Sequence, residues 1–218
     1  MRGFVISLCA ALAGFVSGLV AALLVGAAHI FRLPAFDLAL SRAILVARYV
    51  FNFLQSIGGG GFQILVFSIG VGIFLNNCMV AAIILLSPIP IFKAKSFSDR
   101  YLGRLYKRYS IWLFKPIGWK TYRILAAILP LYALGLQFYL IGGTALLRGF
   151  DLSEMGFLVF EVAAITSVCL IAILPSLSQD PLEYLPRYFS HLKIWLPIAL
   201  ATLLVAGILE SYELLSMA

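Results

Sequence analysis

Charged side chains are scarce in this chain of 218 residues. Asp, Glu, Lys and Arg together make up 11% of it, and only nine residues are acidic. Soluble globular domains carry about 25% charged and about 45–50% apolar residues, whereas 63% of this chain is hydrophobic. One core of this length cannot hide so much apolar surface, so part of that surface must face lipid. The composition excludes an ordinary water-soluble domain.

Residues that build metal and active sites are also few, with two histidines and three cysteines. Cys9, Cys78 and Cys169 each lie in an apolar stretch without CxxC spacing, so neither a disulfide framework nor a metal site is predicted. No nucleophile has a neighbouring base. The glycine run 58–61 lacks the following Lys and Ser or Thr of a phosphate-binding loop. We therefore expect no enzyme activity and no cofactor.

Long apolar runs are what the chain has instead. At about 1.5 Å per residue, a helix needs about 20 residues to cross the hydrocarbon layer. The first run is too long for a signal-peptide core of about 7–15 residues, so it is expected to be a retained span. The alternating pattern of a membrane β-barrel is absent. The prediction is an all-α polytopic membrane bundle, one domain over residues 1–218, with spans at about 4–30, 62–92, 124–147, 155–175 and 192–215.

Prolines and positive charge organise these spans. Pro88 and Pro90 are expected to end the second span, and Pro130 to interrupt the third near its start. The loop 93–123 carries nine Lys and Arg against a single acid, so it should be cytoplasmic. With five spans in the plasma membrane, the N-terminus is then cytoplasmic and the C-terminus outside. Twelve Lys and Arg fall on the inner side and four on the outer side.

Residues 34–57 are less apolar than the five spans. Their polar residues form one stripe, at steps of three, four or seven: Asp37, Ser41, Arg48, Asn52 and Gln55. This pattern predicts a helix that lies in the outer interface or packs against the bundle. The alternative is a sixth span, which would move the N-terminus outside, and the charged residues argue against it. The glycine run that follows predicts a tight turn.

The basic loop has a helical pattern of its own between residues 98 and 114. Its cations share one face while apolar residues fall elsewhere, which is typical of an amphipathic helix. Such a helix most often lies on anionic lipid headgroups, where each cation contributes about 1 kcal/mol. A docking surface for a protein partner is the second interpretation, and nucleic acid is not expected. The residues expected to bind lipid or partner are Arg100, Arg104, Lys107 and Arg108.

A few polar residues lie inside the spans, where they are expensive. An ionised side chain at the bilayer centre costs at least about 2.5–3.5 kcal/mol, so such residues usually face the bundle interior, pair or take up a proton. Glu161 and Glu210 should lie at comparable depth, about 7–9 Å below the outer boundary, and could meet. Interhelical hydrogen bonding or the handling of a proton, ion or solute are the two roles considered. The predicted intramembrane cluster is Asn76, Asn77, Gln137, Glu161 and Glu210.

Three short motifs in this order resemble the stage II sporulation protein M family. They are residues 74–81 (FLNNCMVA), 155–164 (MGFLVFEVAA) and 209–212 (LESY), and the resemblance covers about residues 62–214. The chain departs from the family pattern where Met155-Gly156 replaces a His-Gly pair and Ser87-Pro88 replaces an Asn-Gly turn. The resemblance implies a small helical membrane protein with family-type polar positions at Asn77, Glu161 and Glu210.

Two functions of different classes follow as hypotheses. Sporulation members of that family are membrane scaffolds that assemble with cell-wall hydrolases, so the first is a non-catalytic scaffold or complex subunit. It would present its basic segment to a protein partner or lipid, or assemble with copies of itself through the small residues of its helices. The second is a permease or permease-like subunit in which Glu161 and Glu210 handle a proton, ion or small solute.

Overall fold

The computed structural model describes residues 2–25, 34–148 and 156–216, so residues 26–30 of the first expected span and Met155 lie outside it. The described elements are all helical, which confirms the all-α class. Five stretches in them are long and apolar enough to cross a membrane. In chain order the elements are α1 (Arg2–Val25), α3 (Pro34–Ser56), α4 (Phe62–Leu86), α5 (Pro88–Tyr109), the 3-10 turn η1 (Trp112–Phe114), α6 (Trp119–Arg148), α7 (Gly156–Leu177) and α8 (Pro181–Ser216).

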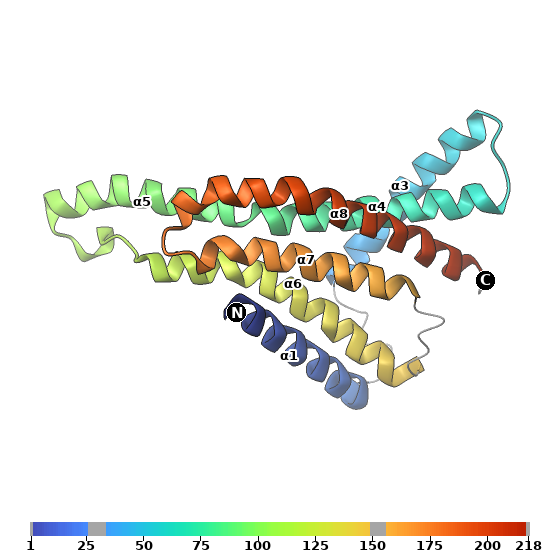
Figure 1. Cartoon of the computed structure of the whole chain (residues 1–218), viewed down its shortest axis with the longest axis horizontal. Helices are drawn as coiled ribbons and strands as arrows, with labels where there is room; N and C mark the ends of the chain where they lie inside the picture. Colours follow the sequence, from blue (N-terminus) through green and yellow to red (C-terminus); the bar gives the residue numbers. More distant parts are fainter. Residues whose placement is uncertain (1, 26–33, 149–155, 217–218) are drawn as a thin grey trace.

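The helices form an elongated bundle with one long projection (Figure 1). Helix α8 packs along α4 and α7, α7 packs on α6, and α1 covers the outer side of α6. Helix α5 continues the line of α4 and extends beyond the bundle. The start of α1 faces the α5 end and the C-terminus lies at the opposite end, which agrees with an odd number of crossings.

Helix α4 ends at Leu86, next to the prolines expected to end the second span, but α5 begins at Pro88 after Ser87 alone, so the chain continues as a helix and not as a loop. Ser87 itself has helical angles (φ −55°, ψ −36°), and Pro88 opens α5 at a position where its missing N–H is no loss. In a continuous helix that N–H would bond to the carbonyl of Ile84. The Ser87 hydroxyl donates to this carbonyl instead, at 2.8 Å. The segment expected as a basic loop is therefore helical up to Tyr109.

Two other proline-containing helices are longer than predicted. Helix α6 runs through Pro130 without a break, which corrects the expected interruption. Helix α8 begins at Pro181 rather than near residue 192 and contains two further prolines over its 36 residues. At about 1.5 Å per residue α8 is about 54 Å long, well over the hydrocarbon thickness of about 30 Å. Its first turns lie beside the α4–α5 junction, where the Tyr188 hydroxyl reaches the Leu85 carbonyl.

Helix α3 is not among the five candidate spans and packs against α4. The contact is close because a Cβ on Gly72 of α4 would collide with the Ala43 carbonyl of α3. The two helices are joined at the glycine run, as predicted. There Gly58 and Gly61 adopt φ of 87° and 94°, which favours glycine.

Tyr188 of α8 stabilises the α4–α5 junction, and its hydroxyl is the part that matters. The side chain is completely buried and its hydroxyl donates to the Leu85 carbonyl, one turn before Pro88. Replacing Tyr188 by Phe keeps the ring and removes one buried hydrogen bond, so we expect a loss of about 1 kcal/mol in unfolding free energy. SDS-induced unfolding in mixed micelles measures this value. Tyr132→Phe, at a side chain that is 62% exposed, is the matched control and should change nothing.

Candidate functional site

Three of the predicted polar residues meet at the carboxylate of Glu161. Asn77 of α4 donates from Nδ2 to Glu161 Oε1 of α7 at 3.5 Å. Gln137 of α6 also hydrogen-bonds the Glu161 side chain. One carboxylate thus joins three helices at a single level of the bundle. Hydrogen bonds of this kind between membrane helices contribute about 0.6 kcal/mol on average.

Asn76 belongs to the same cluster but is less well satisfied. Its Nδ2 donates to Asn77 Oδ1 at 3.4 Å, so the two neighbouring amides are linked. Its own Oδ1 is buried and finds no hydrogen-bond partner among the described residues. A buried amide oxygen without a donor is unfavourable, by about 1–3 kcal/mol. Asn76 is therefore the member of the cluster whose hydrogen bonding is least complete.

Glu210 of α8 joins this cluster by charge. It lies within electrostatic range of Glu161 and of Glu213 on its own helix. Glu213 in turn lies beside the start of α7, with its Oε1 3.8 Å from the position of a Cβ on Gly156. Sequence analysis did not include Glu213, although its i+3 spacing from Glu210 puts both on one helix face. The three acids are thus grouped near the start of α7 and the C-terminal end of α8.

Glycines bring α4 and α8 close enough to form this cluster. A Cβ on Gly207 of α8 would lie 2.8 Å from the Gly70 carbonyl oxygen of α4, so the two backbones touch. Small residues at membrane helix interfaces allow this close approach. The same contact brings Ile208 and Ser211 of α8 against Gly70, within one helical turn of Glu210.

A cation from α3 also reaches α4 at this level. Arg42 Nη1 donates to Met79 Sδ at 3.7 Å, one helical turn beyond Asn76. Arg42 is one of the four Lys and Arg that the predicted topology puts on the outer side. The inclination of α3 against α4 accounts for this contact, because it carries the first half of α3 toward the bundle (Figure 1).

A half-open pocket lies away from Glu161 and Glu210, between α1, α6 and α7. It has a volume of about 100 Å³ and an almost wholly apolar lining, with neither Glu161 nor Glu210 among its residues. Nor do three or more His, Cys, Asp or Glu residues gather anywhere in the described ranges in a way that could hold a metal ion. The pocket lining is Phe4, Ser7, Leu8, Ala11, Leu134, Phe138, Thr166 and Leu170.

The double-mutant cycle of Asn77→Val and Glu161→Gln tests whether the amide and the carboxylate stabilise each other. We expect a coupling of about 0.6 kcal/mol, and no more than about 1.7 kcal/mol, because the denatured state in a membrane also offers partners. Unfolding in mixed SDS micelles gives the four free energies. Pairing Asn77→Val with Ser216→Ala, at an exposed residue near the end of α8, serves as the control. Strictly additive effects at Asn77 and Glu161 would show that their hydrogen bond does not contribute.

A second candidate site lies where α5 leaves the bundle. Lys95 is only 4% exposed, although sequence analysis grouped it with the cations of an open loop. It pairs with Asp99 one turn later, and its Nζ lies 5.2 Å from the centre of the Trp119 ring of α6. Phe92, completely buried, lies 6.4 Å from the same ring. Nearby, Arg123 of α6 donates to the Gln179 carbonyl in the turn between α7 and α8.

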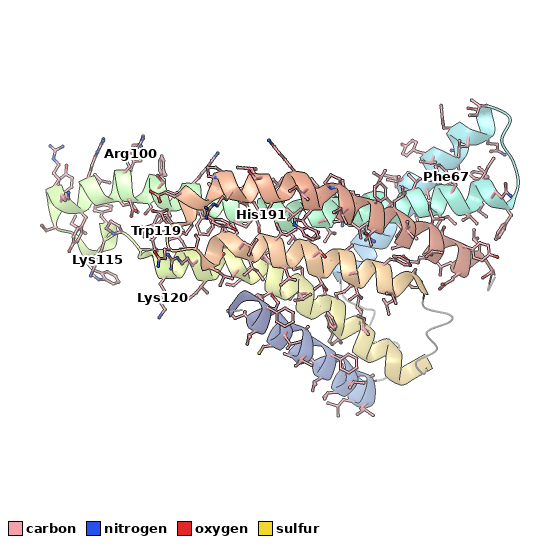
Figure 2. All side chains as sticks on the ribbon, viewed as in Figure 1. Phe67, Arg100, Lys115, Trp119, Lys120 and His191 are labelled. Atoms are coloured by element: carbon pink, nitrogen blue, oxygen red, sulfur yellow. The ribbon has the colours of Figure 1, made fainter. Side chains whose placement is uncertain are left out.

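The four predicted binding cations lie beyond this base and are all exposed: Arg100, Arg104, Lys107 and Arg108. Figure 2 shows Arg100 on the outer side of α5, facing away from the returning segment that carries Lys115. The structure therefore separates two groups that sequence reasoning joined. Lys95 holds the base of α5, and the other cations form its free surface.

The chain matches no family model, and the searches of curated proteins and of solved structures find no match either.

Proposed function

We propose that the protein is a non-catalytic scaffold or subunit of a membrane complex, anchored by its helical bundle and presenting α5 to a partner. The observation that carries this proposal is the rigid attachment of α5 in line with α4 (Figure 1). A basic helix on a flexible loop could lie on any nearby surface. One that is fixed at its base holds its charges in a defined place, as binding a defined partner requires.

The polar cluster supports the same proposal. Asn77 and Gln137 both bond to Glu161, so much of its hydrogen-bonding capacity is used to hold helices together. Sites that work on a substrate usually keep polar groups directed into a pocket. The pocket between α1, α6 and α7 is apolar and is lined by neither Glu161 nor Glu210. The resemblance to the stage II sporulation protein M family points to a scaffold as well.

The test is the size of the assembly in which the protein occurs. We expect native membranes, solubilised in mild detergent, to yield the full chain in a particle larger than the same chain purified alone in that detergent. Light scattering with refractive index detection separates protein mass from detergent mass. Reversing the charge of the α5 cations should shrink the particle, whereas Glu161→Gln should not. A chain that is monomeric in both preparations would contradict the proposal.

The grouping of Glu161, Glu210 and Glu213 favours a second candidate, a permease-like subunit that handles a proton or cation. Acids in electrostatic range of one another in low dielectric favour an added proton or cation. Proteoliposomes with a trapped pH-sensitive dye test this candidate. Under it, Glu161→Gln and Glu210→Gln abolish an ion-driven pH change that Glu183→Gln, at an exposed acid near the start of α8, leaves intact. Absence of flux in every variant favours the scaffold.

A further inference from the structure

The far end of α5 rises well beyond the level of Lys95 and Trp119. Trp119 and Lys95 lie together at its base, and tryptophan marks the membrane interface in many membrane proteins. From Lys95 to Arg104 α5 rises about 13 Å, and to Tyr109 about 21 Å. A headgroup layer adds only about 5–7 Å to each side of the hydrocarbon, and salt screens charges beyond about 8–10 Å. Arg100 and Arg104 lie within this combined range, whereas Arg108, about 20 Å from Lys95 along the helix axis, lies beyond it.

Helix α5 is held in this direction at two places. At its base Phe92 is buried against Trp119 and Lys95 is held between Asp99 and the same ring. Further along, the chain returns past α5 through η1, and a Cβ on Gly103 would lie 3.7 Å from Pro116 Cγ. Laying α5 onto a membrane would break both contacts. Burial of a Phe side chain alone contributes about 1.5–3 kcal/mol, so the upright position is favoured.

Two parallel ridges cover the free surface of α5, each built from residues four apart. Arg100, Arg104 and Arg108 form the cationic ridge, and every one of them is exposed. The apolar ridge is also solvent-facing, at exposures of 62%, 48%, 37% and 53%, and its first two rings lie 4.2 Å apart. Exposed apolar side chains in a row usually mark a contact surface. The residues of the apolar ridge are Phe97, Tyr101, Leu105 and Tyr109.

We infer that these two ridges bind an acidic amphipathic helix of a partner protein, on the side that the positive-inside rule assigns to the cytoplasm. Ridges of residues four apart interdigitate with the same ridges of another helix. Carboxylates on one ridge of the partner would face the three arginines, and apolar residues on its next ridge would cover Phe97 to Tyr109. This inference rests on the proposed scaffold function and names the chemistry of the partner.

Charge argues against a second copy of the chain as the occupant. The chain carries a formal net charge of +7, and its only acid between residues 93 and 123 is Asp99. Asp99 already pairs with Lys95. Two α5 helices packed along these ridges would place arginine against arginine, and like charges across an interface cost several kcal/mol. A helix that supplies carboxylates avoids this cost.

Binding of a designed helix to the whole protein tests the inference. The full chain is placed in nanodiscs of neutral phosphatidylcholine and titrated with a fluorescent peptide of about 18 residues, long enough to form a helix. The peptide carries Glu along one i,i+4 ridge and Leu along the next. A second peptide has the same composition in shuffled order. We expect the ordered peptide to bind at least about tenfold more tightly, because only it aligns both ridges.

Variants of the full chain supply the controls. The triple change Arg100→Glu, Arg104→Glu and Arg108→Glu should weaken the ordered peptide by at least about tenfold, because like charges then face each other. The same arginines changed to Gln should give a smaller loss, and this variant is retained in case the first does not fold. A matched variant of equal charge change should bind within about twofold of wild type, because its residues lie off the two ridges: Lys115→Glu, Lys120→Glu and Arg187→Glu.

The possible results separate the inference from its alternatives. Equal binding of both peptides would mean that the surface attracts acidic peptides without specificity, and would overturn the inference. Absence of peptide binding would also overturn the inference. The same holds if the full chain binds phosphatidylglycerol vesicles, nucleic acid or a second nanodisc instead of the ordered peptide. None of these results would remove the larger particle expected from native membranes. The particle size therefore tests the scaffold proposal, and the peptide titration tests the chemistry of the partner helix.

Discussion

Replacing Gly14 by Leu is expected to detach α1 from α6. A Cβ at Gly14 would collide with the Gly135 carbonyl oxygen and lie 2.9 Å from the Gly135 Cα. The obstacle is backbone, which cannot rotate away as a side chain can. Overpacking at a contact that does relax costs about 1–3 kcal/mol, so we expect a loss of about 3 kcal/mol or more here. Unfolding of the purified chain in mixed SDS micelles measures the change.

The contact is repeated along both helices, which is why one substitution should act on the whole interface. A Cβ on Gly18 would collide with the Tyr139 carbonyl, and one on Gly142 with the Phe15 carbonyl. Ala13→Leu is the matched control because Ala13 is exposed on the same helix and should tolerate Leu in lipid. If Gly14→Leu were as stable as Ala13→Leu, α1 would not be docked on α6 through these glycines.

Sequence reasoning predicted the membrane bundle, because long apolar runs have few alternatives in a chain with so little charge. It was less successful with the ends of the helices. Proline was read as a helix breaker at Pro88 and Pro130, but Pro88 opens a new helix one residue after α4 ends, and Pro130 lies inside α6. The missing bonds are compensated locally, as the Ser87 hydroxyl shows at Ile84. Compensation of this kind depends on a neighbouring side chain, which hydropathy does not register.

The residues of the polar cluster could be predicted from the sequence, but not which of them contact one another. Rarity alone marked Asn77, Gln137 and Glu161, since few polar residues occur in the spans. Their meeting depends on how α4, α6 and α7 pack against one another, which the sequence pattern did not resolve. A signal for close packing was present in α1, where Gly14 and Gly18 form a GxxxG motif in an apolar helix. The motif itself does not indicate which helix α1 contacts.

The direction of α5 is the part of the candidate site that could not be predicted. Amphipathic periodicity identified its basic face correctly, with Arg100, Arg104 and Arg108 all exposed. Periodicity describes only the faces of a helix, however, and an interfacial helix and an upright one share the same pattern. The burial of Phe92 and Lys95 decides between them, and both contacts come from α6.

Replacing Phe92 by Ala is expected to release α5 from the bundle. The side chain is completely buried against Trp119, and removing a phenyl ring from such a site costs about 3–5 kcal/mol. Because this contact lies at the base of α5, much of the loss should appear as local opening rather than as global unfolding. Hydrogen–deuterium exchange of the full chain in nanodiscs should show faster exchange over residues 96–109 while α4 stays protected.

Phe97→Ala separates loss of an aromatic ring from loss of the anchor. Phe97 is on the same helix, one turn further along, and is 62% exposed, so its removal should change stability by no more than about 0.5 kcal/mol. Slow exchange over residues 96–109 in Phe97→Ala and fast exchange in Phe92→Ala would locate the support of α5 at its base. Equal exchange in both variants would mean that the Phe92 contact does not hold α5, and would contradict the assignment of its support to the base.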